Sequence, residues 1–168
     1  VDPQSPYVPE LQGLVHMRRG SMRTARQELG KAYRLDQTDH EILFWYGVTL
    51  VFTGQFPLAR TIFAQSRRID PGNTSIGSLE AASLYFQGRF DEAARRLEAI
   101  VQGSQLPINR FLLGATLAFC GRTADSIAVL GALASLPPDM FTDLGAFLRH
   151  ALLGEATQHD RVSARRRR

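Results

Sequence analysis

The chain has 168 residues, of which 44% are hydrophobic, enough for one domain with a substantial core. Its apolar runs are all shorter than the ~18 residues that span a bilayer, so we expect no membrane span. Cys120 is the only cysteine, which excludes an internal disulfide framework and a cysteine-rich metal site.

The positive charge of the chain is concentrated at its end. There are 20 basic and 16 acidic residues, and Arg165 to Arg168 account for the whole net charge of +4. We therefore expect a basic tail rather than a basic face on the folded domain, which disfavours a nucleic-acid partner. The chain begins at Val1 with no secretory pattern, so we expect a cytoplasmic protein and leave an upstream signal or domain open.

The chain repeats itself with a period of 34 residues. Residues 1–5 are predicted to be an N-terminal extension, and a first unit covers 6–39. If Pro6 is counted as position 1, small residues stand at positions 8, 15 and 20, namely Gly13, Gly20 and Ala25. The unit 40–73 begins 34 residues later and has Gly47, Gly54 and Ala59 at the same positions.

Two further units follow in the same register. The unit 74–106 is one residue short and has Ala81, Gly88 and Ala93 at positions 8, 15 and 20. The unit 107–140 has Gly114, Gly121 and Ser126 there. A helix is predicted at about 139–153, where it would cap the open end of the repeats. Residues 155–168 are predicted to be a disordered basic tail.

The recurring residues have a packing explanation. Small residues at positions 8 and 20 allow two helices to cross closely, and glycine at position 15 suits a left-handed residue where the first helix ends. The larger residue at position 24, Phe63 in the second unit, is expected to fill the space between neighbouring repeats. Each unit is thus predicted to be a helix, a turn and a second helix.

This pattern resembles the tetratricopeptide repeat (TPR) family. The resemblance covers the chain from residue 6 to about 154, as a single domain of about four repeats and a capping helix. It implies an all-α fold, namely a right-handed solenoid of antiparallel helix pairs. It also implies a non-enzymatic module for binding other proteins.

The resemblance also implies where a ligand would bind. In this family the first helix of each repeat lines a concave groove, with positions 2, 5, 9, 12 and 13 nearest the ligand. The predicted peptide-binding residues are therefore Phe44, Val48, Val51, Phe52, Ser78, Ala82, Tyr85, Phe86, Phe111, Ala115 and Phe119. This wall is apolar and aromatic, although aromatic residues at helical spacing are also typical of a core. The expected partner is a protein or peptide with apolar anchors.

A chaperone-tail receptor is not expected. TPR domains that hold a C-terminal carboxylate carry Lys, Asn and Arg at five groove positions. Those positions are occupied here by Glu10, Leu14, Trp45, Ser75 and Leu79. The cationic clamp is therefore absent.

Three other functions stay open. The stretch from Gln27 to Ala59 and the segment LEAASLYFQGRFDEAARRLEAI resemble bacterial type III secretion chaperones for translocator proteins. Those chaperones generally carry three repeats, whereas four are predicted here. The chain is also compatible with a regulatory segment of a larger protein. The third alternative is a self-associating scaffold, that is, a homo-oligomer.

No catalytic or metal site is predicted. The sequence has no glycine-rich phosphate loop after a strand, no G-x-S-x-G and no H-E-x-x-H. The histidines, His16, His40, His150 and His159, lack metal-ligand spacing. We interpret Cys120 as a buried small hydrophobe, and we expect no cofactor.

Overall fold

The computed structural model describes residues 5–166, apart from the side chains of residue 74 and residues 155–166. All regular structure in this part of the chain is helical, which confirms the predicted all-α fold. The elements in chain order are α1 (Tyr7–Arg18), α2 (Met22–Leu35), α3 (His40–Phe52), α4 (Phe56–Ile69), α5 (Thr74–Phe86), α6 (Phe90–Gly103), α7 (Pro107–Phe119), α8 (Thr123–Gly131), the 3-10 helix η1 (Ala132–Ser135) and α9 (Met140–Arg166).

The helix boundaries follow the predicted repeat register. The first helix of every repeat ends at position 13 and the second begins at position 17. Between them, Gly20, Gly54, Gly88 and Gly121 have φ angles of 75°, 73°, 74° and 74°. A residue with a Cβ atom is strained in this left-handed conformation, which explains glycine at position 15.

The chain forms two compact units, residues 1–86 and 87–168. The division lies between α5 and α6, inside the third predicted repeat. We call residues 1–86 unit 1 and residues 87–168 unit 2. The continuous solenoid over residues 6–154 stays a prediction.

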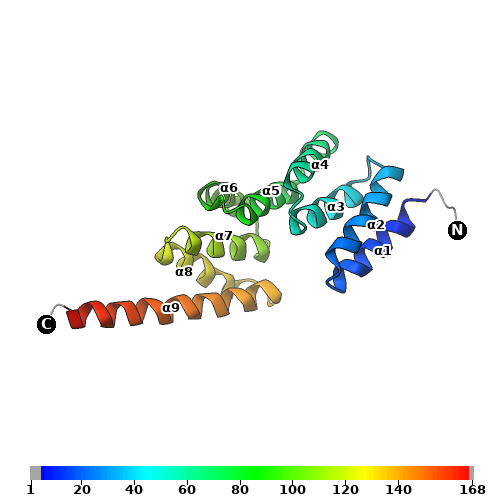
Figure 1. Ribbon diagram of the computed structural model, residues 1–168. Coiled ribbons are helices and arrows are strands. Elements are labelled where there is room, and N and C mark those ends of the chain that lie inside the picture. Colours follow the sequence, from blue (N-terminus) through cyan, green and yellow to red (C-terminus); the bar gives the residue numbers. More distant parts are fainter. Residues whose placement is uncertain (1–4, 167–168) are drawn as a thin grey trace. The chain divides into compact units, whose positions relative to one another are not determined.

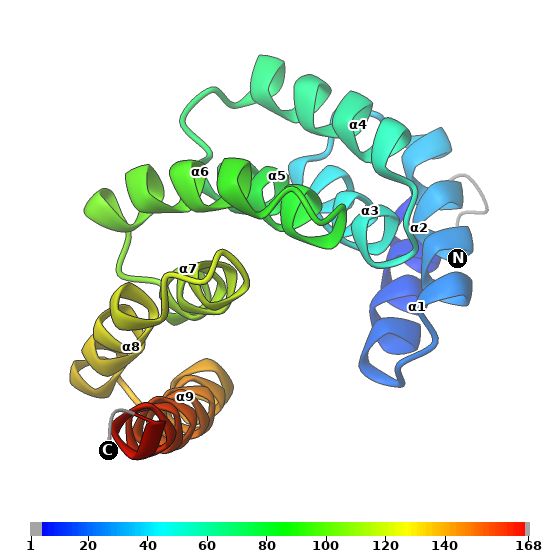
Figure 2. The same cartoon turned by 60° about the vertical axis from the view of Figure 1, so that its left-hand side comes forward.

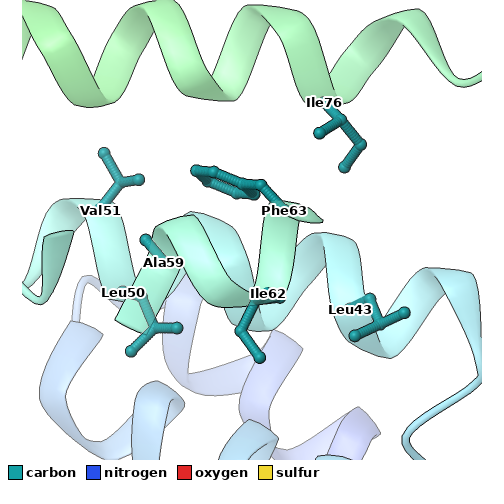
Figure 3. Packing of buried hydrophobic residues seen from close by; sticks show 7 residues of the cluster. All are labelled: Leu43, Leu50, Val51, Ala59, Ile62, Phe63 and Ile76. Carbon is teal, nitrogen blue, oxygen red and sulfur yellow. The ribbon is translucent and has the colours of Figure 1, made fainter. Parts of the chain in front are cut away.

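Unit 1 consists of the helices α1 to α5. Figure 1 shows α1 and α2 lying side by side as a pair; α2 also packs on α3, and α5 contacts both α3 and α4. The buried cluster of this unit comes from three helices (Figure 3): Leu43, Leu50 and Val51 of α3, Ala59, Ile62 and Phe63 of α4, and Ile76 of α5.

The residue at position 24 lies over the glycine at position 8 of its own repeat. A Cβ atom added to Gly47 would come within 2.6 Å of the Phe63 ring, and one added to Gly13 within 2.6 Å of Leu29. Phe63 therefore does more than fill space between repeats, as the sequence suggested. It requires position 8 to carry no side chain at all.

Unit 2 consists of α6 to α9. Figure 2 shows α7, α8 and α9 as neighbours, and all three helices contact one another. The Ser126 hydroxyl donates a hydrogen bond of 2.7 Å to the Gly114 carbonyl oxygen, which joins positions 20 and 8 as expected. Helix α8 has only 9 residues and continues into η1, where Leu133 is buried against Gly145 of α9.

The last helix is longer than the predicted cap. It begins at Met140 and its helical backbone continues to Arg166, past residue 153. The tail predicted for residues 155–168 falls where side chains, and at 167–168 the backbone too, lie outside the described residues. Among the residues that are described, none of the helices is both long and apolar enough to cross a membrane.

Candidate functional site

Three aromatic residues of unit 1 gather where two helices end. Phe52 is the last residue of α3 and Phe86 the last of α5, and their ring centroids lie 5.3 Å apart. Tyr85 meets Phe86 edge to face, also at 5.3 Å. Phe52 is 54% exposed and Phe86 46% exposed. We call Phe52, Tyr85 and Phe86 the aromatic patch.

The other predicted residues of α3 are less accessible. Phe44 is half-buried, packs against the core cluster and contacts Trp45 edge to face at 4.9 Å. Val48 is buried. Val51 is only 2% exposed, and Figure 3 shows it among the core residues beside Phe63. Val51 is therefore a packing residue, which corrects its expected place on the groove wall.

Helix α5 carries two small residues on the face that also bears Tyr85 and Phe86. Ser78, Ala82, Tyr85 and Phe86 are spaced so that they share one face of the helix. Ser78 and Ala82 are half-buried. The Ser78 hydroxyl oxygen is buried and has no hydrogen-bond partner in the described part of the chain.

The predicted residues of unit 2 form a separate set. Phe111 is half-buried and its ring lies 5.9 Å from that of Phe141, while Ala115 is buried. Phe119 is exposed and stacks on Phe90, with ring centroids 4.8 Å apart and an interplanar angle of 13°.

Sequence reasoning did not place Phe90 or Phe141 beside these residues. Phe90 begins α6 at position 17, where the second unit also has a phenylalanine, Phe56. That recurrence was a usable signal. Nothing in the spacing predicted the contact of Phe141 with Phe111.

The electrostatics of unit 1 agree with the missing cationic clamp. The pKa of the Glu10 carboxyl is raised above its ordinary value, first by burial and then by the nearby carboxylates of Asp39 and Glu41. Glu41 also accepts a hydrogen bond of 3.0 Å from the indole Nε1 of Trp45. Carboxylates thus occupy a region where a carboxylate-binding TPR domain needs cations.

A polar cavity of about 780 Å³ borders the aromatic patch. Arg26 reaches across it and donates a 3.3 Å hydrogen bond to the Thr53 hydroxyl. Its lining holds no cysteine, histidine or carboxylate. The lining residues are Gly20, Ser21, Met22, Arg23, Thr24, Arg26, Phe52, Thr53 and Gln55.

Neither the single cysteine nor the possible metal-binding side chains that the structure describes form a reactive site. Cys120 is half-buried rather than buried, and burial, followed by a hydrogen bond with Asp91, raises the pKa of its thiol. The protonated thiol therefore dominates near neutral pH, which does not suit a nucleophile. Within the described residues, no three His, Cys, Asp or Glu side chains are grouped so as to hold a metal ion.

Comparison with known proteins gives matches at the level of structure. No family model and no curated protein matches the chain. A tetratricopeptide repeat protein from Parabacteroides merdae ATCC 43184 matches with a TM-score of 0.80 at 12% identity over 90% of this chain. The chain spans 60% of the length of that protein.

Two further solved structures match over most of both chains. MamA from Desulfovibrio magneticus RS-1, from its residue 41 to the end, has a TM-score of 0.62 at 19% identity, with 95% of each chain covered. YrrB, a TPR protein with an unusual peptide-binding site, has a TM-score of 0.56 at 15% identity, covering 89% of this chain and 80% of its own. With the left-handed glycines and the repeat register, these matches show that the chain has the tetratricopeptide repeat fold.

Proposed function

We propose that the chain is a non-enzymatic protein-interaction module whose aromatic patch receives an apolar side chain of a peptide or amphipathic helix. The observation that carries this proposal is the contact between Phe52 and Phe86. Two large rings lie 5.3 Å apart at the ends of two helices, and about half of each is open to solvent.

The geometry of the patch favours tight binding for its size. Aromatic rings bury a large apolar area with few rotatable bonds, and such residues dominate binding energies at protein interfaces. Here the rings are held by packed helices, so little conformational entropy is lost when a ligand binds. The peptide-binding site reported for YrrB shows that a protein of this fold can bind a peptide.

The surroundings of the patch favour a ligand with mixed chemistry. The polar cavity that borders Phe52 is lined by Arg23 and Arg26, whose charges favour an acidic residue in the ligand. An apolar anchor close to an acidic residue is therefore the expected motif.

The predicted residues of unit 2 belong to the same proposal. Phe119, stacked on Phe90, offers a second apolar surface, with Phe111 and Ala115 on the same helix, α7. Removing the unit 1 patch is accordingly expected to weaken binding of ligands selected on unit 1 without unfolding unit 2.

The experiment uses peptides selected from a random phage-displayed library against the full 168-residue chain. The affinity of one selected peptide is measured by fluorescence polarisation for the parent and for a Phe52→Ala, Phe86→Ala double variant. Loss of a central aromatic anchor costs about 2 kcal/mol, so we expect a loss of affinity of roughly 30-fold or more.

The matched control is Leu58→Ala, which removes an apolar side chain of similar exposure from α4. It is expected to leave the affinity unchanged. Equal affinities for the parent and the double variant, with both folded by circular dichroism, would contradict the proposal.

A further inference from the structure

The first helices of the repeats can be compared with one another by how deeply the same positions are buried. Helices α3, α5 and α7 each pack against the helix that precedes them, α2, α4 and α6. Positions 3 and 10 of these three helices are buried without exception: Ile42, Thr49, Ile76, Ser83, Asn109 and Thr116. Burial of positions 3 and 10 thus accompanies the packing of a preceding helix against the first helix of a repeat.

Helix α1 has apolar residues at the same positions but exposes them. Val8 and Val15 stand at positions 3 and 10 and are both exposed. Leu11, between them, is 61% exposed, and Tyr7 extends the surface. Gly13 faces the opposite way, against Leu29 of α2. We call Tyr7, Val8, Leu11 and Val15 the α1 outer face.

Helix α9 carries a second exposed apolar stripe. Met140, Leu144 and Phe147 follow one another at spacings of four and three residues, and all three are exposed, Phe147 to 75%. Gly145, on another side of the helix, packs on Leu133. The terminal helices of repeat proteins need a polar outer surface to stay soluble as monomers, whereas α1 and the described part of α9 each expose an apolar stripe. We call Met140, Leu144 and Phe147 the α9 stripe.

The charges beside the two surfaces are complementary in one orientation. Arg18 and Arg19 are exposed at the end of α1, and Asp143 is exposed in the first turn of α9. None of these three side chains has an ion-pair partner among the described residues. An antiparallel arrangement places Asp143 near the arginines, whereas a parallel one places Arg149 and His150 there and is repulsive.

We propose that a second copy of this chain covers the α1 outer face, with the α9 stripe of that copy lying antiparallel along it. The contact reproduces between copies the packing that α2 provides for α3 within one copy. It joins two different surfaces, so the pair keeps one free surface of each kind and can add further copies. This association is independent of the aromatic patch.

Two single variants test the proposal, Leu11→Glu on α1 and Phe147→Glu on α9. Both side chains are more than half exposed, so the variants are expected to fold, as circular dichroism would verify. Sedimentation velocity over a range of concentrations should show a mass above that of a dimer for the parent and a monomer for each variant alone. An equal mixture of the two should form dimers and nothing larger, because only one intact interface remains.

The matched control Leu58→Glu places the same charge on an exposed position of α4 and should associate like the parent. A parent that is monomeric throughout would overturn the proposal, and the α1 outer face would then await a different occupant. A Leu11→Glu variant that associates like the parent would also overturn it, since α9 would then pair with α9.

Charge reversal tests the orientation. Arg18→Glu with Arg19→Glu should weaken association by roughly two- to fivefold per ion pair lost. Adding Asp143→Arg to the same chain should restore it, because the signs are then exchanged across the interface. If Asp143→Arg does not restore association, and Asp143→Arg alone does not weaken it either, the antiparallel arrangement is excluded.

Discussion

Glu10 is a residue whose charge opposes folding. Its carboxyl pKa is raised from 4.5, first by burial and then by Asp39 and Glu41, so the charged form is less favourable in the folded chain than in the unfolded one. The charge on Glu10 therefore lowers the free energy of unfolding, and this effect is present in full above the raised pKa. It declines as the pH falls through that pKa and is absent below 4.5, where both states are protonated.

We therefore predict that Glu10→Gln raises the free energy of unfolding at about pH 7 and that the gain shrinks toward about pH 4. Urea unfolding followed by the fluorescence of Trp45, the only tryptophan, measures it in unit 1. Asp70→Asn serves as the control, because it removes one negative charge from unit 1 and keeps the oxygen that accepts a hydrogen bond from the Gly72 N–H group. A gain that is the same at both pH values would argue against a titration effect.

Individual residues also mark where sequence reasoning ends. Position 8 was predicted to be small, and the contacts of Gly47 with Phe63 and of Gly114 with Leu130 explain why. The burial of Val51 was not predicted. Helix α3 is apolar on nearly every side, so a spacing of 3.6 residues does not separate its core face from its exposed face.

Local hydrogen bonds stabilise the ends of the helices, and the residues that form them can be recognised in the sequence. Asp39 precedes α3, and its carboxylate accepts hydrogen bonds from the backbone N–H groups of Glu41 at 2.8 Å and Ile42 at 3.1 Å. These donors have no partner within the helix, so the aspartate stabilises the beginning of α3.

We predict that Asp39→Ala lowers the free energy of unfolding by about 1 kcal/mol, because the N-cap is lost. Asp39→Asn is the matched control, since asparagine caps a helix nearly as well and likewise removes the charge. Urea unfolding by circular dichroism would show the alanine variant less stable than the asparagine variant. Equal stabilities would mean that the carboxylate acts through its charge and not as a cap.

At the scale of elements, the register of the repeats was predictable and the end of the array was not. Glycine at position 15 ends each first helix through its positive φ, a local constraint visible in sequence. Helix α8 instead ends early, at Gly131, and the chain continues as η1, where Leu133 packs against Gly145 of α9. Such contacts between helices can override the helix propensity of the local sequence, and no periodic pattern in the sequence predicts them.

At the scale of the whole molecule, we propose a ligand surface on unit 1 and association surfaces on α1 and α9. The candidate residues Phe52, Tyr85 and Phe86 could be named from the sequence because the resemblance to the TPR family implies that positions 12 and 13 line a groove. Their contact with one another was not, since it requires α3 and α5 to end side by side.

The central claim is that ligands bind at the aromatic patch, and photo-crosslinking tests it most directly. The 168-residue chain is prepared with p-benzoylphenylalanine at position 52, at position 86 or, as the control, at position 58. After irradiation with a library-selected peptide, mass spectrometry identifies the product. We predict that the peptide is joined to the chain at positions 52 and 86 and not at 58. Crosslinking at 58 with none at 52 or 86 would contradict the account.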